Sequence, residues 1–190
     1  MVYSRTTRLA AVVIGVSMAS MALAQDSTAP AEEPPAEPAA GEAFLAGTFS
    51  DWQLRCERLQ DGVDRCQMYQ LLTDQSGNSV AEINLFPLPE GGPAEAGAAV
   101  MTPLETLLTE NLRVSVDGGE VRVYPYSFCT VEGCVAQLGF TPEEVTGFKR
   151  GAAAQVTLVP ARAPDRTVDL TMSLSGFTAA YDELRARSGL

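Results

Sequence analysis

The stretch between Phe128 and Phe140 constrains the fold more than any other part of the chain, because it places two cysteines around a short turn. Cys129 and Cys134 flank four residues that favour a turn, and apolar residues then alternate with small or polar ones up to Phe140. Alternation with a period of two beside a glycine-containing turn predicts a β-strand that leaves a hairpin. A disulfide at the mouth of this hairpin would fix the register of the neighbouring strands. We therefore expect a sheet organised around a stapled hairpin.

A second pair of cysteines predicts a second stapled hairpin, with its turn at Asp61-Gly62. Centring the register on Asp61 brings three favourable cross-strand pairs into place at once: a disulfide, an apolar pair and an ion pair. These pairs are Cys56 with Cys66, Leu54 with Met68, and Glu57 with Arg65. Because one register satisfies all three, we expect the hairpin to form with this pairing.

The four cysteines allow three connectivities, and the two hairpins favour Cys56–Cys66 together with Cys129–Cys134. Each bridge would close a short loop and stabilise the fold by about 2–3 kcal/mol. The long spacing of the first two cysteines disfavours a zinc site, and the second pair lacks the Cys-x-x-Cys spacing of a thioredoxin-like centre. A labile, redox-active Cys129–Cys134 bridge stays open as an alternative to a structural one, because small rings can be strained.

The first 24 residues have the features of a secretory signal peptide. Arg5 and Arg8 precede an apolar run, and the small-x-small triplet that ends at Ala24 fits a cleavage site, although an uncleaved anchor is the alternative. Residues 25–43 are rich in Pro, Ala and Glu, which predicts a disordered linker. Residues 44–190 have the length of one domain. Cysteines paired in disulfides require an oxidising compartment, so we expect an exported protein.

Composition excludes several classes of site. Residues 44–190 contain 11 basic and 19 acidic side chains, a net charge of −8, and Lys149 is the single lysine. A domain this acidic should repel nucleic acid. The chain has no histidine, which excludes a Ser-His-Asp triad, a Cys-His pair and a His-based metal site. We therefore expect no catalytic residue, no metal and no cofactor.

The remaining pattern predicts many short strands with brief helices between them. Alternating apolar residues predict strands over residues 79–86, 98–101, 114–116, 121–124, 155–159 and 167–174, with a turn at 117–119. Three short helices are expected: one from Pro103 to Asn111 with a buried stripe of leucines, one over residues 142–150 after a Thr141 cap, and a C-terminal one from Phe177 to Leu184. This order predicts a mainly β, single β-sandwich-like domain with two or three short helices.

Loops at the ends of such a scaffold are the usual places for contact with a partner. The candidates are the Thr130–Gly133 hairpin tip and the Pro87–Gly97 loop. An aromatic stripe precedes the tip, and it could stack a sugar or a peptide, although such stripes more often belong to a core. Pro125 places this stripe at an edge or bend of the sheet. The predicted contact residues are Val131, Glu132, Gly133, Tyr124 and Tyr126.

Five groups of residues, spread over most of the chain, form an ordered set. They are Trp52-x-Leu54-x-Cys56, Arg65-Cys66-Gln67-Met68-x-Gln70, Pro103-Leu104, Phe128-Cys129 with Gly133-Cys134-Val135-Ala136, and Ser173-Leu174-x-Gly176-Phe177-Thr178-x-Ala180. From about Phe49 to Leu184, this set resembles the invasion-associated locus B family. The resemblance implies a β-sandwich protein of the periplasm, or associated with the outer membrane, of a Gram-negative bacterium. In some pathogens the family is linked to entry into host cells, and no catalytic residues come with it.

We therefore expect an exported, non-enzymatic envelope protein that acts as a binding or structural module. Its expected partner is an envelope or host-surface protein or glycan, and neither nucleic acid nor a membrane span of the mature chain is expected. Two alternatives stay open. One is a glycan hydrolase that uses carboxylates at turns, such as Asp117, Glu120 and Glu132. The other is a thiol-redox accessory protein that uses Cys129–Cys134.

Overall fold

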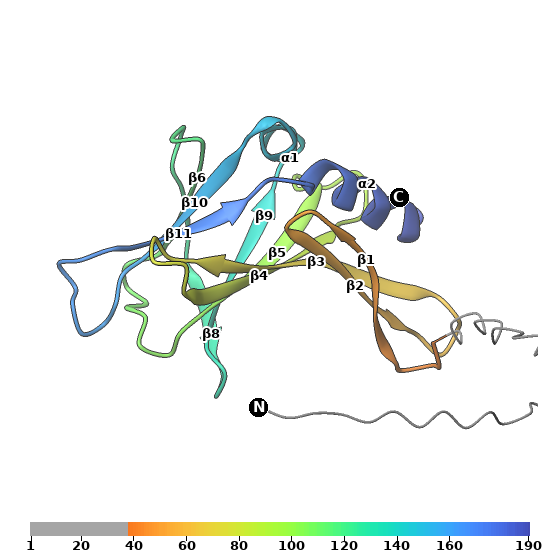
Figure 1. Ribbon diagram of the computed structural model, residues 1–190, viewed down its shortest axis with the longest axis horizontal. Coiled ribbons are helices and arrows are strands. Elements are labelled where there is room, and N and C mark those ends of the chain that lie inside the picture. Colours follow the sequence, from red (N-terminus) through yellow and green to blue (C-terminus); the bar gives the residue numbers. More distant parts are fainter. Residues whose placement is uncertain (1–37) are drawn as a thin grey trace, which may run out of the picture. The chain divides into compact units, whose positions relative to one another are not determined.

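The computed structural model describes residues 38–190, so the predicted signal peptide and most of the predicted linker lie outside the described residues. These residues form eleven strands and two helices (Figure 1). The strands are β1 (Ala43–Phe49), β2 (Trp52–Arg58), β3 (Asp64–Thr73), β4 (Ser79–Pro87), β5 (Ala96–Thr102), β6 (Leu112–Val116), β7 (Arg122–Tyr124), β8 (Tyr126–Cys129), β9 (Cys134–Phe140), β10 (Ala153–Leu158) and β11 (Val168–Ser173). The helices are α1 (Pro142–Arg150) and α2 (Phe177–Arg187). Neither helix is long and apolar enough to cross a membrane.

The hydrogen-bonded order of the strands gives the fold two sides. β7, β6, β10 and β11 form one side, and β3, β4, β5, β9 and β8 form the other, with β2 and β1 added beyond β3. A single residue pair, Thr171 with Thr73, joins β11 to β3. β7 and β8 are the two ends of the order, yet only Pro125 separates them in the chain. The sheet therefore folds back on itself at Pro125, which confirms the predicted bend and gives the sandwich-like, antiparallel architecture.

A buried glutamine reinforces the weak junction between the two sides. Gln70 of β3 donates to the Ser173 carbonyl at 3.0 Å and accepts from the Ser173 N–H at 2.7 Å. The Trp52 indole N–H donates to the same carbonyl at 2.9 Å. Both Gln70 and Trp52 are buried. Side chains from β2 and β3 therefore supply hydrogen bonds where the β3–β11 ladder is short, and burial makes these bonds costly to lose.

Both predicted hairpin registers are confirmed. Cys56 pairs with Cys66, Leu54 with Met68, and Glu57 with Arg65 across β2 and β3. Cys129 likewise pairs with Cys134 across β8 and β9. Disulfides close both pairs, with S–S distances of 2.03 Å.

Two of the predicted helices are confirmed, and both pack against the sheet. α1 begins with the expected Thr141 cap, and Glu144 completes a capping box by accepting from the Thr141 N–H at 2.8 Å. α2 buries its aromatic stripe, where Phe177 meets Trp52 of β2 edge to face at a centroid distance of 5.5 Å. Helix α2 packs on β1, β2, β3 and β4 (Figure 1). The C-terminal helix therefore covers the first hairpin and ends beside it.

The helix predicted from Pro103 to Asn111 is wrong. This segment consists of turns, and Leu104 and Leu108 are 56% and 41% exposed instead of forming a buried stripe. The Leu107 N–H donates to the Val159 carbonyl at 2.7 Å, and the Glu105 carbonyl accepts from the Ala161 N–H at 2.7 Å. Hydrogen bonds to the segment after β10 thus replace the helical ones, so tertiary pairing overrides a strong local signal. Strand β1, which the sequence analysis did not predict, extends the first hairpin by one strand.

Candidate functional site

Strand β3 extends past the strand beside it. Its pairing with β2 begins at Asp64, whereas its pairing with β4 begins only at Met68, opposite Leu85. Within residues 38–190, the segment from Asp64 to Gln67 is therefore paired with a strand on one side only. Continuing the β3–β4 register by two residues would place Pro87 opposite Cys66. Proline has no N–H to give to a ladder, so β4 cannot complete the pairing there.

The backbone of Cys66 points toward this unpaired side. Antiparallel pairs alternate between hydrogen-bonded pairs and closer pairs without hydrogen bonds. Leu59 donates its N–H to the Val63 carbonyl at 2.8 Å, so that pair is hydrogen-bonded. Alternation makes Cys56–Cys66 a non-hydrogen-bonded pair, and its Cα–Cα distance of 4.0 Å agrees. The N–H and C=O of Cys66 are consequently directed away from β2.

A cleft of about 790 Å³ lies beside this edge, compared with about 380 and 360 Å³ for two hollows elsewhere on the described residues. Its volume is within the range of ligand-binding clefts. The hollow touches both faces of β3, because it is lined by Cys66 from the face toward the core and by Arg65 from the opposite face. Its apolar lining comes from the hairpin end, the β4 end and the C-terminus: Ala43, Leu59, Val63, Phe86, Pro87, Pro89 and Leu190.

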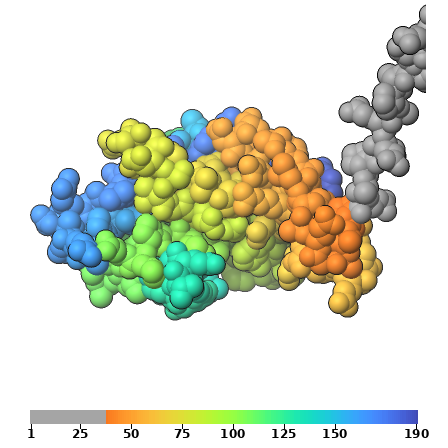
Figure 2. Space-filling view, turned by 60° about the horizontal axis from the view of Figure 1, so that its bottom comes forward, coloured from red at the N-terminus to blue at the C-terminus, as the bar shows by residue number. Residues whose placement is uncertain are grey.

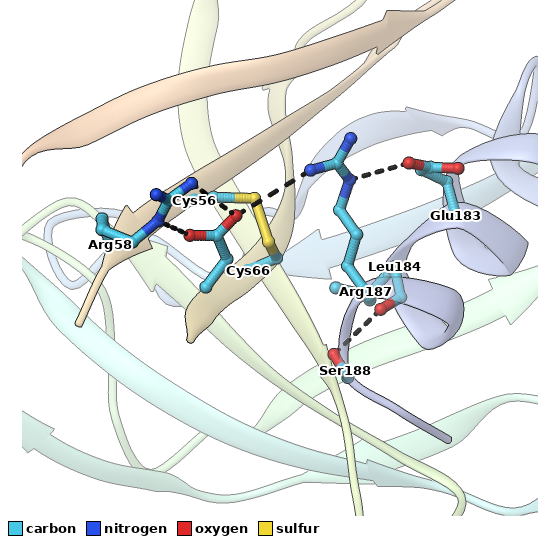
Figure 3. Close-up of polar contacts among 8 residues, drawn as sticks. Cys56, Arg58, Cys66, Glu183, Leu184, Arg187 and Ser188 are labelled. Carbon is cyan, nitrogen blue, oxygen red and sulfur yellow. Dashed lines mark hydrogen bonds and ion pairs between the residues drawn. A yellow bond between two sulfur atoms is a disulfide. The ribbon is translucent and has the colours of Figure 1, made fainter. Parts of the chain in front are cut away.

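The end of α2 forms one wall of the cleft. Ser188 and Leu190 line it, and Ser188 donates its hydroxyl to the Leu184 carbonyl at 2.8 Å. Figure 3 shows the last turn of α2 beside the Cys56–Cys66 disulfide, with Arg187 directed toward the hairpin. Arg187 pairs with the Asp64 carboxylate at 4.0 Å and with Glu183 at 2.7 Å. The Arg187–Asp64 pair links the end of α2 to β3, and the other two contacts stabilise the helix end itself.

The charged side chains around the cleft neutralise one another. Arg65 pairs with Glu57 at 2.6 Å, and Asp64 pairs with Arg58. The Arg55 guanidinium lies 3.2 Å from the centre of the Tyr69 ring, on the outer face of the hairpin. Burial raises the pKa of Tyr69, and its hydrogen bond to Glu82 adds to the shift. The lining side chains thus include two arginines and two carboxylates, whose charges balance.

The predicted contact residues at the second hairpin have mixed accessibility. Val131 is 93% exposed and Glu132 is exposed, whereas Gly133 is buried against β5. A Cβ at Gly133 would lie 2.5 Å from the Thr102 carbonyl oxygen. The tip and the β1–β3 arm occupy different parts of the surface, coloured teal and orange in Figure 2. The prediction therefore identified an exposed tip, but that tip is distant in this view from the arm that carries the cleft.

Tyr124 and Tyr126 are half-buried, and both contribute to packing. Tyr124 meets Phe140 edge to face at a centroid distance of 6.1 Å. Burial raises the pKa of Tyr124 to about 12, and the nearby Glu144 carboxylate adds to the shift. Burial also raises the pKa of Tyr126, which the Thr102 side chain partly offsets. These two rings pack partly against the core, whereas Phe128, the third ring of the predicted stripe, is 49% exposed.

The predicted loop is shorter than expected and is tied to α2. Strand β4 runs to Pro87 and β5 begins at Ala96, which leaves residues 88–95. Arg185 of α2 pairs with Glu90 at 3.1 Å and with Glu95 at 3.3 Å. The Tyr181 hydroxyl donates to Glu95 at 2.9 Å. Burial and this carboxylate raise the pKa of Tyr181 to about 12. The loop is therefore an anchored rim, and its residue Pro89 reaches the cleft.

The acidic turn residues proposed for a hydrolase lie in separate parts of the fold, and two of them have partners there. The Asp117 carboxylate accepts from the N–H groups of Ala152 and Ala153 at 3.0–3.2 Å. Glu120 pairs with Arg122 at 3.5 Å. The β6–β7 and β8–β9 turns, which carry these acids and Glu132, lie at opposite ends of the view in Figure 1. In the described part of the chain, no three His, Cys, Asp or Glu side chains lie close enough to hold a metal ion.

Sequence reasoning missed the cleft, although one signal for it was present. The register of the first hairpin was predicted correctly, and Pro87 was recognised as the end of a strand. To infer the cleft from the hairpin register and the strand end at Pro87, one also needs the β3–β4 register, which places Pro87 opposite Cys66. A proline opposite an outward-facing backbone pair predicts a gap in the ladder. Leu190 and Ser188 gave no such signal, because their place depends on how α2 packs.

These features define a class of protein: a small antiparallel β protein, stapled by two local disulfides, with a preformed apolar cleft. A family model for the invasion associated locus B (IalB) protein matches residues 52–185. The chain belongs to this family.

Individual relatives agree with this assignment. Invasion protein B homologs from Brucella abortus strain 2308 and from biovar 1 strain 9-941 are each 25% identical to the chain over 146 residues, which cover 77% of this chain and 82% of the relative. The crystal structure of invasion associated protein b from Bartonella henselae matches with a TM-score of 0.65. The two sequences are 21% identical, and the match covers 77% of this chain and all of the Bartonella chain. The likeness supports the fold.

Proposed function

We propose that this protein is an exported binding module of the cell envelope, in the periplasm or at the outer membrane, with no reaction of its own. The single observation that carries the proposal is the cleft beside Cys56–Cys66, which is preformed, mainly apolar and lined by charged side chains that balance one another. Such a site suits recognition, because a rigid scaffold loses little conformational entropy on binding.

The lining of the cleft also supports binding over catalysis. Three of its four charged side chains form ion pairs, the fourth, Arg55, stacks on the Tyr69 ring, and both of its sulfur atoms are committed to a disulfide. General acid–base chemistry needs a group of suitable pKa that can reach the substrate, and nucleophilic chemistry needs a free nucleophile. The names of the Brucella relatives and of the Bartonella structure refer to invasion, which fits contact with an envelope or host-surface partner.

Two surfaces are available for this contact. We place the principal one at the cleft, and the exposed hairpin tip with Val131 and Glu132 is the second. The tip projects from the sheet, whereas the cleft provides enclosed apolar area, and enclosed apolar contacts contribute most to affinity. The half-buried Tyr124 and Tyr126 and the buried Gly133 would support the tip from beneath.

Association with the envelope tests the proposal. Val63→Glu places a charge in the cleft mouth, and Val123→Glu is a matched control, because both valines are 55% exposed and Val123 lies outside the cleft lining. After cell fractionation, we expect the first variant to lose most envelope association and the second to retain it, with equal thermal midpoints. Val131→Glu tests the tip in the same way.

Turnover assays on the purified protein supply the opposing result. Steady hydrolysis of a glycan or a peptide, or catalytic thiol exchange through Cys129–Cys134, would show that the protein is an enzyme. Normal envelope association of both the cleft and the tip variants would equally contradict the binding role at these surfaces.

A further inference from the structure

The cleft presents an unpaired strand edge in addition to apolar side chains. From Asp64 to Gln67, β3 has β2 on one side and the cleft on the other. The alternation of the hairpin directs the N–H and C=O of Asp64 and Cys66 to the cleft side. Backbone groups in this arrangement form the template on which another extended segment can pair.

We propose that the cleft binds an extended, uncharged and mainly apolar peptide segment of a partner protein, which adds as a strand to β3 beside Cys66. This inference rests on the proposed binding function and names the chemistry of the partner. Four residues of β3 are available, so about four residues of the partner would pair at about 3.4 Å per residue.

Charge complementarity favours an uncharged occupant. The charges of Arg55, Glu57, Asp64 and Arg65 balance, and their ion pairs and ring contact already engage them. A charged ligand would have to break these contacts or lose hydration without a partner, which is costly. An apolar segment instead covers Val63, Phe86 and Leu190, whose side chains are 55%, 37% and 39% exposed.

Side-chain alternation of the added strand fits the two walls of the cleft. Successive side chains of a strand point to opposite faces. Those on one face would meet Leu190 and the Cys56–Cys66 disulfide beside the end of α2, as Figure 3 shows for that end of the helix. Those on the other face would meet the outer side of the hairpin at Arg65 and Gln67. Pro87 cannot compete for the Cys66 carbonyl, because it has no N–H.

Two other occupants have partly matching chemistry. A lipid acyl chain is also apolar and uncharged, but it would leave the Cys66 N–H and C=O without partners. A second copy of this chain could pair through the same edge, but the cleft is narrowed by Pro87 and Pro89 on one side and by Leu190 on the other. The peptide segment is the occupant that satisfies both the backbone edge and the apolar walls.

The test uses the purified exported protein and a defined probe, the acetylated and amidated peptide Val-Thr-Val-Thr-Val. Two further peptides carry N-methyl groups on one or the other set of alternate amides. NMR titration follows the amides of Asp64, Cys66 and Val123. We expect shifts at the first two only, and binding weakened about tenfold or more by one methylation set but little by the other.

Variants and competing outcomes complete the test. Val63→Glu should lower the affinity for the parent peptide about tenfold, and Val123→Glu should leave that affinity unchanged. Equal binding of all three peptides, tighter binding of uncharged 1-decanol at the same amides, no shift at Cys66, or a concentration-dependent dimer that Val63→Glu abolishes would each overturn strand addition. Envelope association that persists alongside such a result would leave the binding function standing with a different ligand.

Discussion

The two stapled hairpins use the same covalent device in opposite surroundings. In the β2–β3 hairpin both cysteines are buried, 3% and 5% exposed, and the disulfide borders the cleft. In the β8–β9 hairpin Cys134 is buried, but Cys129 is exposed and the tip projects from the sheet. β3 continues into the centre of the sheet, whereas β8 is one end of the strand order. A local disulfide therefore fixes the register in both hairpins, and the surroundings decide whether it supports a binding surface or only a turn.

The largest difference between the two hairpins should appear when each disulfide is removed and the loss in the free energy of unfolding is measured. Replacing Cys56 and Cys66 by alanine should lower the free energy of unfolding by about 4 kcal/mol, because loop entropy and buried sulfur packing are lost together. The same change at Cys129 and Cys134 should cost about 2 kcal/mol, because its ring is smaller and half of it is exposed. Urea unfolding of both double variants measures the difference. Equal losses would remove the distinction between the hairpins.

Substituting the turn glycine of each hairpin by alanine should give a smaller difference in the free energy of unfolding, measured in the same way. Gly62 has a φ of +82° and open space around it, so Gly62→Ala should cost about 1 kcal/mol for backbone strain alone. Gly133→Ala must move the tip away from the Thr102 carbonyl, and we expect a cost of about 2 kcal/mol. The second hairpin would thus be the less tolerant one at its turn. If Gly133→Ala costs less than Gly62→Ala, the tip is not held against β5 as described.

A pH titration should reveal, beside each hairpin, a tyrosine whose pKa is raised to about 12. Burial raises the pKa of Tyr124, next to β8, and of Tyr181, in the helix over β2 and β3, to about 12. Their ordinary value is 10.0, so folding favours the protonated rings. This contribution is complete below pH 10 and is lost as the pH rises from 10 through 12. Urea unfolding should show that Tyr124→Phe and Tyr181→Phe each reduce the fall in the free energy of unfolding between pH 10 and 12. A wild-type free energy of unfolding that stays constant above pH 10 would contradict the predicted direction.

The sequence predicted what local chemistry determines. Cys56, Cys66, Glu57 and Arg65 specify one hairpin register because each pair must meet across two adjacent strands, and the structure has that register. The helix predicted at Pro103 failed because hydrogen bonds from the segment after β10 compete with the local cap. Such competition depends on residues more than 50 positions away, to which propensity rules are blind.

The cleft lay beyond prediction for a related reason. It requires β4 to part from β3 at Pro87 and the end of α2 to stop beside the gap, and the α2 wall has no local signature. The exposed tip, by contrast, was predictable because a turn between two cysteines must lie at a surface. Sequence reasoning therefore favoured the tip as the contact surface, and packing is what makes the cleft the stronger candidate.

The most direct test of the central claim is site-specific photo-crosslinking in living cells. A photoreactive amino acid replaces Val63 at the cleft or Val123, the equally exposed control outside it, and Val131 at the tip provides the third position. The account predicts a discrete protein adduct from position 63 that Phe86→Glu diminishes, and none from position 123. An adduct from position 131 alone, with position 63 silent, would contradict it.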